Sequence, residues 1–454
     1  MDKRTFLKNS SLVIGAAITG TWNSCSPKKS DTQMQEVIKN WAGNLEFSTN
    51  QIHFPDSLEK AQRLVQKLPK LRVLGSKHSF NTIADSTVNL VSTEKLNRVI
   101  QLDKDNAQVT VEAGVKYGEL CEMLHENGFA LHNLASLPHI SVAGSIATAT
   151  HGSGLENGNL ASSVSGLEFI NGKGELIELK KGEADFDGAV VALGALGMVT
   201  KVTLDLVPTF EVAQVVYRQM PVQALEENFL KIMSEGYSVS LFTDWTTDTI
   251  NEVWVKKKVE PGKDTHFEEE FFGAKQAESN IHPVEGMDAQ SCTEQMGVPG
   301  PWFDRLPHFK MQFQPSAGEE LQSEYFVSIE YAFDAFKAVE ELASRISPHL
   351  FVSEIRTAKA DDLWLSTCYG RDSLIIHTTW KQEIPEVMEL LPELEAKLAP
   401  FAPRPHWGKL FTLDPEFVQQ QYERMTDFRK LMHTHDPEGK FRNAFIDKNL
   451  GPLT

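Results

Sequence analysis

The amino-acid sequence predicts an α+β protein with more than one domain. The chain has 454 residues, long enough for two or three domains and a large buried core. Helix-like and strand-like segments alternate from residue 40 to about 207, whereas strand-like runs predominate from about 210 to 403. Hydrophobic residues at 41% and charged residues at 23% are typical of an ordered globular chain.

The first predicted unit is a helix followed by a strand. Asp56 can cap the helix together with Glu59, three residues later. The apolar positions of this helix fall on one stripe and are Leu58, Ala61, Leu64, Val65 and Leu68. A short strand at 71–74 follows and ends at Gly75.

A hairpin, a second helix and a long strand are predicted next. The turn pair Asp105-Asn106 indicates the hairpin, and the apolar face of the helix begins at Tyr117 and stops at Gly128. Pro208 ends an alternating run, so we place a domain boundary near residue 207. The predicted strands of this region lie at 88–91, 99–102, 109–111 and 199–207.

The second half of the chain is expected to be rich in strands. An acidic, Gly- and Pro-containing segment at 260–302 interrupts it and is expected to be a loop. The predicted strands lie at 239–242, 253–255, 325–329 and 374–379.

Residues 1–30 have the layout of an export signal. Lys3 and Arg4 begin a basic start that resembles a twin-arginine export signal with Lys in place of the first Arg. A short apolar stretch follows, and Ser24-Cys25 resembles a lipoprotein cleavage site. We expect an exported protein, in the periplasm or anchored to a membrane through a lipid on Cys25. Whether Cys25 is lipidated stays open, and a disordered N-terminal tail is the alternative.

Composition and motif content exclude several function classes. Lys plus Arg minus Asp plus Glu is 44 − 62 = −18, a charge that repels nucleic acid. The four cysteines have no CxxC spacing, so neither a zinc site nor a disulfide framework is indicated. The signatures of nicotinamide, nucleoside-triphosphate, zinc-protease and serine-hydrolase enzymes are also absent from the sequence.

Two segments of small residues could bring the backbone close to a large ligand. The first, at 74–80, is a strand end and a tight loop whose N–H groups could cradle a pyrophosphate. In the second, eleven of the fourteen residues from Ser141 to Gly154 are Gly, Ala, Ser or Thr. This composition suits contact with a flat ligand, although a close turn between two elements would also require it.

These segments, together with 404–411 (RPHWGKLF), resemble FAD-linked oxidases of the vanillyl-alcohol oxidase superfamily, and within it the alditol (xylitol) oxidases. The resemblance runs from about residue 40 to the C-terminus and includes 237–245 and 297–302. It implies a two-part FAD-binding domain with an antiparallel-sheet substrate cap. Accordingly, we expect an FAD domain at 40–207, a cap at 208–403 and a return to the FAD domain at 404–454.

The resemblance also implies roles for individual residues. His78 corresponds to the residue that attaches covalently to FAD, although this chain has Lys77 where alditol oxidases usually have Gly. The residues expected to bind FAD are Gly75, Ser76, Lys77, His78, Ser79, Phe80, Ser136, Ser141, Gly144, Thr148, Ala149, Thr150, His151 and Val199. No metal is expected.

Two pairs of polar residues are expected to form the catalytic site. Glu354 and Arg356 are two apart, as are His377 and Thr379, so on strands each pair points to one face. The resemblance implies that Arg356, Glu354, His377 and Lys409 are catalytic, and that Ser136, Glu354, Arg356, Thr379 and Lys409 hold the substrate. The sequence leaves open whether His377 or Lys409 is the base.

The implied activity is oxidation of a terminal primary hydroxyl of an alditol, with O2 as the acceptor and hydrogen peroxide as a product. We expect a polyol substrate, no nucleic acid partner and a monomer. Two alternatives remain: an aldonolactone oxidase or dehydrogenase of the same fold, and a carbohydrate-binding surface lipoprotein without catalytic activity.

Overall fold

The computed structural model describes residues 37–310 and 319–451. The predicted signal segment at 1–30, including Cys25, lies outside these residues. The first described elements are helix α1 (Leu58–Lys67) and a three-stranded parallel sheet of β1 (Ile52–His53), β3 (Leu90–Ser92) and β2 (Arg72–Leu74). They confirm the predicted helix–strand unit.

The predicted cap of helix α1 is wrong by one residue. Ser57 has the extended backbone of an N-cap, and its side chain accepts a hydrogen bond from the Lys60 N–H at 3.3 Å. Asp56 instead pairs with the Lys60 ammonium group at 2.7 Å on the exposed surface. The two side chains therefore have different roles at the same helix end.

Replacing Ser57 by Ala should lower the free energy of unfolding by about 1 kcal/mol, because a backbone N–H of the first turn loses its acceptor. Ser57→Asp, which keeps an acceptor, should cost less, and Asp56→Ala should change stability little because its ion pair is exposed. Urea unfolding of the three variants measures the difference. A larger effect for Asp56→Ala than for Ser57→Ala would contradict this assignment.

A five-stranded antiparallel sheet follows in the chain, and the predicted hairpin forms one edge of it. In spatial order its strands are β4 (Val99–Asp103), β5 (Gln108–Glu112), β9 (Gly197–Asp205), β7 (Val164–Asn171) and β8 (Leu176–Lys180). The associated helices are α2 (Tyr117–Glu126), α3 (Val142–Ala147) and α4 (Phe186–Val190). Gly128 has a φ of 85° and follows α2, as predicted.

The predicted strand at 199–207 is two elements. β9 ends at Asp205, and β10 (Val207–Pro208) pairs instead with β6 (Phe129–Ala130) in a separate two-stranded sheet. Proline is tolerated there because both strands are edges and no further strand needs its missing N–H.

The second half of the chain forms a ten-stranded sheet in which every paired strand is antiparallel. In spatial order the strands are β14 (Glu270–Phe271), β15 (Ala274–Gln276), β11 (Glu211–Pro221), β13 (Thr249–Val259), β12 (Ser238–Thr243), β18 (Leu350–Ala358), β19 (Ser373–Lys381), β17 (Glu320–Ser328) and β20 (Arg404–Pro405), and β16 (Gly300–Pro301) also pairs with β11. The antiparallel-sheet expectation is confirmed, although most predicted strands were too short.

The segment expected to be a loop is only partly irregular. Residues 260–302 contribute β14, β15 and β16, which extend the edge of the large sheet at β11, and lead into helix α6 (Trp302–Arg305). Their two- and three-residue lengths give no periodic signal, which is why the sequence did not reveal them.

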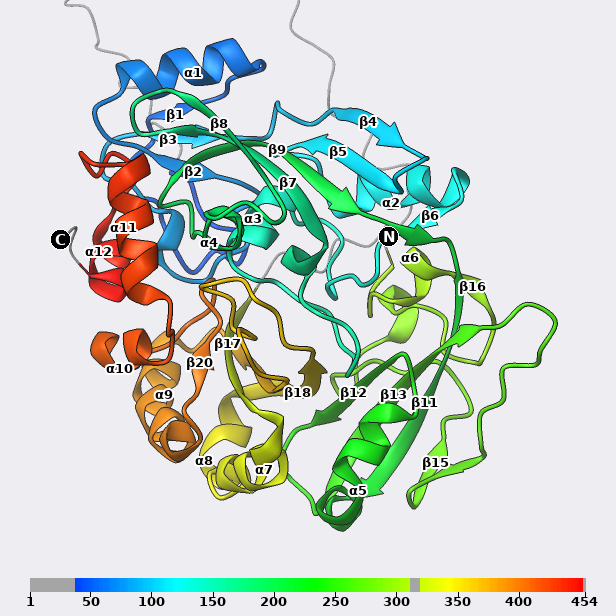
Figure 1. Cartoon of the computed structure of the whole chain (residues 1–454). Coiled ribbons are helices and arrows are strands. Elements are labelled where there is room, and N and C mark those ends of the chain that lie inside the picture. Colours follow the sequence, from blue (N-terminus) through cyan, green and yellow to red (C-terminus); the bar gives the residue numbers. More distant parts are fainter. Residues whose placement is uncertain (1–36, 311–318, 452–454) are drawn as a thin grey trace, which may run out of the picture. The chain divides into compact units, whose positions relative to one another are not determined.

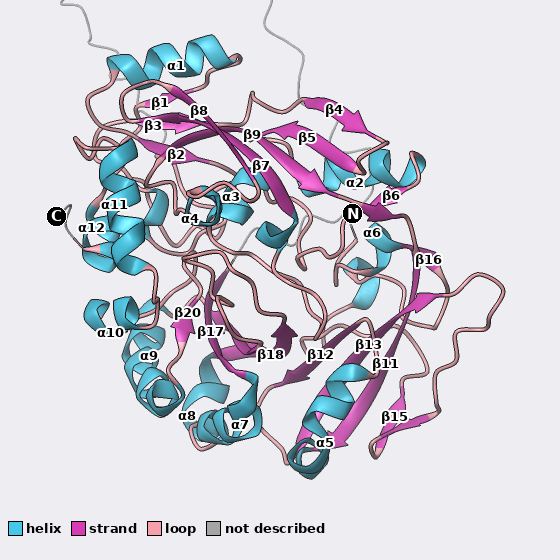
Figure 2. Ribbon diagram, viewed as in Figure 1, coloured by secondary structure: helices cyan, strands magenta, loops and turns pink. Residues whose placement is uncertain are grey.

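Helices cover one side of the large sheet, as Figures 1 and 2 show. These helices are α5 (Val222–Ser234), α7 (Ala332–Glu340), α8 (Ala343–Ile346) and α9 (Ile384–Leu398). Tyr325 of β17 points to this side, because its hydroxyl donates to Glu395 of α9 at 2.7 Å. Side chains alternate along a strand, so Glu324 points to the opposite face.

The C-terminal segment returns to the first elements. It contains α10 (Pro415–Gln420), α11 (Met425–His435) and α12 (Ala444–Leu450), of which α11 and α12 lie beside the N-terminal sheet in Figure 1. Arg72 of β2 donates to the Phe441 carbonyl at 2.6 Å, and the Phe80 N–H donates to the Gly408 carbonyl at 2.7 Å. Residues near both ends of the described chain thus meet, while the predicted domain limits stay predictions.

Candidate functional site

A cavity of about 710 Å³ collects side chains from four separate parts of the chain. The early segments and loops supply one wall, the face of the large sheet that carries Glu324 a second, 406–409 a third, and residues between 282 and 309 a fourth. The predicted site residues that line it are Gly75, Ser76, Lys77, His78, Ser79, Phe80, Ser136, Gly144, Thr148, Thr150, His151, Val199, Glu354, Arg356, His377, Thr379 and Lys409.

Two predicted site residues do not line this cavity. Ala149 is fully buried behind its wall with a φ of 55°, and Ser141 is the buried N-cap of α3. A Cβ added at Gly75 or Gly144 would approach the Ser141 Oγ to 2.7 or 2.8 Å. Ser141 therefore lies where two small-residue segments approach each other, which agrees with a close turn between two elements.

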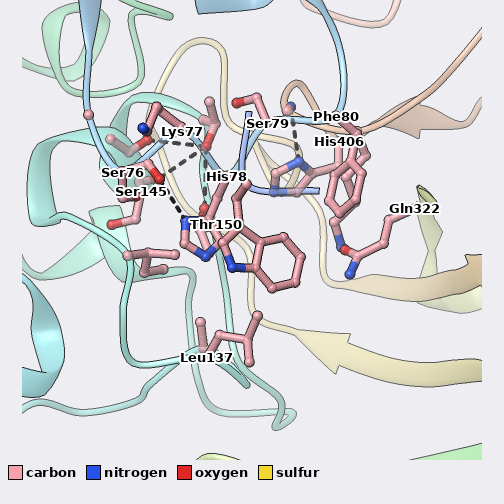
Figure 3. A pocket seen from close by; sticks show the side chains of 18 of the residues that line it. Ser76, Lys77, His78, Ser79, Phe80, Leu137, Ser145, Thr150, Gln322 and His406 are labelled. Carbon is pink, nitrogen blue, oxygen red and sulfur yellow. Dashed lines mark hydrogen bonds between the residues drawn. The ribbon is translucent and has the colours of Figure 1, made fainter. Parts of the chain in front are cut away.

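His78 projects from the loop that follows β2. Its Nδ1 faces the Ser76 carbonyl at 3.1 Å, so Nδ1 carries the proton and Nε2 keeps its lone pair. Burial lowers the pKa of His78 to about 4, and Nε2 is buried without a hydrogen-bond partner in the structure. The Trp41 ring stacks on the imidazole at 4.9 Å. Figure 3 shows this loop, from Ser76 to Phe80, at the cavity.

Lys77, the departure from the family pattern, has a left-handed backbone with a φ of 63°. Glycine adopts this conformation without strain, which explains why a glycine suits the position. The Trp41 N–H donates to the Lys77 carbonyl at 2.8 Å and helps to hold the loop in this conformation.

The predicted polar pairs form one row across the large sheet. Glu324 on β17 is opposite His377 on β19, and His377 is opposite Glu354 on β18. Thr379 accompanies His377 on the same face, with 3.0 Å between the His377 Nε2 and the Thr379 Oγ1. Arg356 Nη1 donates to the Ser136 hydroxyl at 3.4 Å, so the sheet also contacts the opposite wall.

Glu324 lies at the centre of this site, although the sequence did not predict it as a site residue. Its Oε1 accepts a hydrogen bond from Arg356 at 2.7 Å, and its Oε2 lies 2.9 Å from the Lys409 Nζ and 3.2 Å from the His151 Nε2. Burial alone would raise the pKa of Glu324, but Lys409, His151 and Arg356 hold this pKa well below its usual value. The predicted strand began at Tyr325, one residue too late to include it.

Lys409 and His377 lie close together, and both have lowered pKa values. The Lys409 Nζ lies 2.8 Å from the His377 Nδ1. Burial, reinforced by the charge of Lys409, lowers the pKa of His377 to about 4, so its imidazole is neutral at neutral pH. Burial also lowers the pKa of Lys409, and Glu324 offsets only part of this effect.

Glu354 is fixed from two sides. Its Oε1 lies 2.8 Å from the His308 Nε2 and 3.5 Å from the Arg356 Nε. Burial would raise the pKa of Glu354, but Arg356 and His308 outweigh it and hold the pKa below the usual value. His308, Gln322 and His406 also line the cavity and were missed. His308 and Gln322 lie outside the predicted strands, whereas His406 belongs to the segment 404–411, in which only Lys409 was assigned a role.

Within residues 37–310 and 319–451, no cluster of three metal-ligating side chains occurs. No helix of this described part is long and apolar enough to cross a bilayer.

Comparison with known proteins gives a consistent set of similarities. Residues 50–180 match the family model of the FAD binding domain, and residues 316–449 match that of D-arabinono-1,4-lactone oxidase. The chain is 42% identical to an alditol oxidase of Streptomyces sp., over 91% of this chain and 99% of that protein. It is 28% identical to an L-gulono-1,4-lactone dehydrogenase of Mycobacterium tuberculosis, over 92% of this chain and the full length of that protein.

Among solved structures, a cholesterol oxidase from B. sterolicum has the same fold. The TM-score is 0.74, the sequence identity is 16%, and the match covers 91% of this chain and 96% of that chain. This similarity supports the fold prediction alone.

Proposed function

Because the chain belongs to the alditol oxidases, FAD-linked oxidases of the vanillyl-alcohol oxidase superfamily, we propose that it oxidises a terminal primary hydroxyl of an alditol. The observation that carries this proposal is the row Glu324–His377–Glu354 with Arg356 and Lys409, which places acceptors and donors for hydroxyl groups in one buried cavity.

The cavity wall fits FAD as the cofactor. The small residues of the loop 75–80 and of 144–151 line the cavity, and the unpartnered His78 Nε2 offers a nucleophile. When bound, FAD supplies the acceptor for the hydride removed from the substrate carbon. We propose that His78 holds it covalently and that the loop 75–80 and residues 144–151 hold its remaining groups.

The charges of the substrate wall favour a neutral polyol. The Arg356 guanidinium is balanced by Glu324 and Glu354, so it is not free to pair with a substrate carboxylate. Ser136, Thr379, Glu354 and Arg356 can instead exchange hydrogen bonds with vicinal hydroxyls. Holding several hydroxyls orients the terminal carbon and makes the reaction effectively unimolecular.

We assign proton removal to Lys409. The His377 Nδ1 faces the Lys409 Nζ and the His377 Nε2 faces the Thr379 hydroxyl, so neither ring nitrogen of His377 is free to accept a substrate proton. Once deprotonated, Lys409 keeps two N–H groups, and its lone pair can accept the hydroxyl proton. Because burial lowers the pKa of Lys409, this neutral form is reached at a lower pH than for a solvated lysine.

Substrate comparison tests the activity. We expect the purified enzyme to consume O2 and form hydrogen peroxide with xylitol- and sorbitol-like alditols, faster than with lactones or with lactate. Peroxide formation with aldonolactones alone would reject alditol oxidation in favour of a lactone oxidase, and turnover with an artificial acceptor but not O2 would reject the oxidase assignment.

Glu354→Gln should lower kcat/KM for alditols tenfold or more, because a charge-assisted hydrogen bond to a hydroxyl is worth about 1.5–3 kcal/mol. It should also raise the relative rate on 2-hydroxy acids, since Arg356 loses part of its compensation. Steady-state kinetics on both substrate classes measure this change. Unchanged alditol kinetics would remove Glu354 from the substrate site.

The covalent tether has a direct test. After acid precipitation, the yellow colour should stay with the polypeptide, and His78→Ala should release it into the supernatant. His266→Ala is the matched control, because His266 lies on the exposed segment that carries β14 and β15. Flavin that leaves the unmutated protein entirely would refute the tether.

We also propose that residues 1–30 export the protein and that the mature enzyme is a monomer, attached to a membrane only if Cys25 carries a lipid. Cell fractionation and mass spectrometry of the mature N-terminus test export, and light scattering tests the monomer. Full-length protein confined to the cytosol would reject the export proposal.

A further inference from the structure

Lys256 and His308 are buried next to Glu354, and the proposed mechanism does not use them. We call these two hydrogen-bonded side chains the Lys256–His308 arm. Lys256 is on β13, His308 follows α6, and Glu354 is on β18, so the arm crosses the intervening strand β12. All three side chains are buried, and no proposed step accounts for a buried lysine at this position.

The lysine end of the arm is fixed by main-chain acceptors. The Lys256 Nζ donates to the carbonyls of Leu306 at 2.5 Å and Pro307 at 3.3 Å, and it lies 3.5 Å from the His308 Nδ1. Burial lowers the pKa of Lys256 to about 7, an effect that Glu354 opposes and Arg305 reinforces. The ammonium group thus holds the segment before His308 against the sheet.

The histidine end of the arm has one defined tautomer. A carboxylate only accepts hydrogen bonds, so the His308 Nε2, 2.8 Å from Glu354 Oε1, carries a proton. Burial lowers the pKa of His308, which leaves the imidazole neutral and its Nδ1 lone pair directed to Lys256. The rings of Phe242 and Trp254 pack edge-on against the imidazole at 5.4 and 5.1 Å and fix its plane.

We propose that His308, held by Lys256, is a positioning residue that fixes the Glu354 carboxylate and thereby sets the affinity of the site for polyol hydroxyls. The inference rests on the proposed alditol oxidation. His308, which also lines the cavity, engages Oε1, so Glu354 meets the substrate in a fixed orientation and loses little freedom on binding.

Three substitutions test the arm in the flavin-loaded enzyme. His308→Leu removes the N–H that Glu354 uses and should raise KM for the preferred alditol about tenfold while kcat changes less than threefold, because Glu354 binds the substrate before and during the reaction. His308→Gln keeps a side-chain N–H and should retain a KM within threefold of the unmutated enzyme. Lys256→Met should raise KM by an intermediate factor.

The control is Lys257→Met, which changes the neighbouring lysine of the same strand, whose Nζ contacts the His266 carbonyl on the exposed side. It should leave KM unchanged. Flavin content and melting temperature are measured for every variant, so that loss of folding is separated from loss of positioning. If His308→Leu does not fold, the comparison of His308→Gln with Lys256→Met decides.

Equal KM values for His308→Leu and His308→Gln, or an unchanged KM in both His308→Leu and Lys256→Met, would overturn the inference. An equal fall of kcat and kcat/KM without a change in KM would also overturn it. Failure of the proposed function is distinct, because the unmutated enzyme itself would then not oxidise alditols.

Discussion

Replacing Glu324 by Gln should lower kcat/KM for alditols at least a hundredfold. The substitution keeps the size of the side chain but removes the negative charge that Arg356, Lys409 and His151 share. Removing one partner of a buried ion pair costs about 3–5 kcal/mol, because the remaining charge is left without compensation. The melting temperature should fall together with the activity.

Glu330→Gln is the matched control for this substitution, since Glu330 follows the same strand but is exposed. Steady-state kinetics and thermal unfolding of both variants give the comparison. A Glu324→Gln enzyme with normal kinetics would show that the charge at the centre of the row has no part in catalysis.

Lys409→Met should lower kcat by a factor of about 10²–10⁴, the usual contribution of a general base. In the unmutated enzyme, kcat/KM should rise with pH as Lys409 loses its proton, with a midpoint below 10.5, because burial lowers the pKa of this amine. The variant should lose this dependence on pH, and an added small amine should restore part of the rate.

His377→Asn separates the two candidates for the base. Asn keeps an acceptor for the Lys409 ammonium group, so we expect a smaller loss of kcat than for Lys409→Met. A larger loss for His377→Asn, together with an unchanged pH profile in Lys409→Met, would transfer the role of base to His377.

The sequence predicted the site residues best where polar side chains follow the two-residue spacing of a strand. Glu354 and Arg356, like His377 and Thr379, are spaced by two residues in recognisable strands, and the structure places both pairs on the cavity face. Glu324 obeys the same rule but lies in the first half of β17, before the apolar run that identified the strand.

Other residues could not be found from local patterns. Lys256 and His308 are far apart in the sequence and meet only because the segment that follows α6 folds against β13. Ser57 and Asp56 are both good capping residues, and only the backbone angles decide between them. The first case depends on tertiary contacts and the second on local backbone geometry, and periodicity encodes neither.

The meeting of early and late segments has a consequence for biosynthesis. The cavity is complete only after 406–409 has joined the loop 75–80, more than 300 residues after that loop leaves the ribosome. Contacts so distant in sequence form late in folding. The cavity therefore has all its walls only in a finished chain, and a cofactor that binds within them must meet the complete polypeptide in the same compartment.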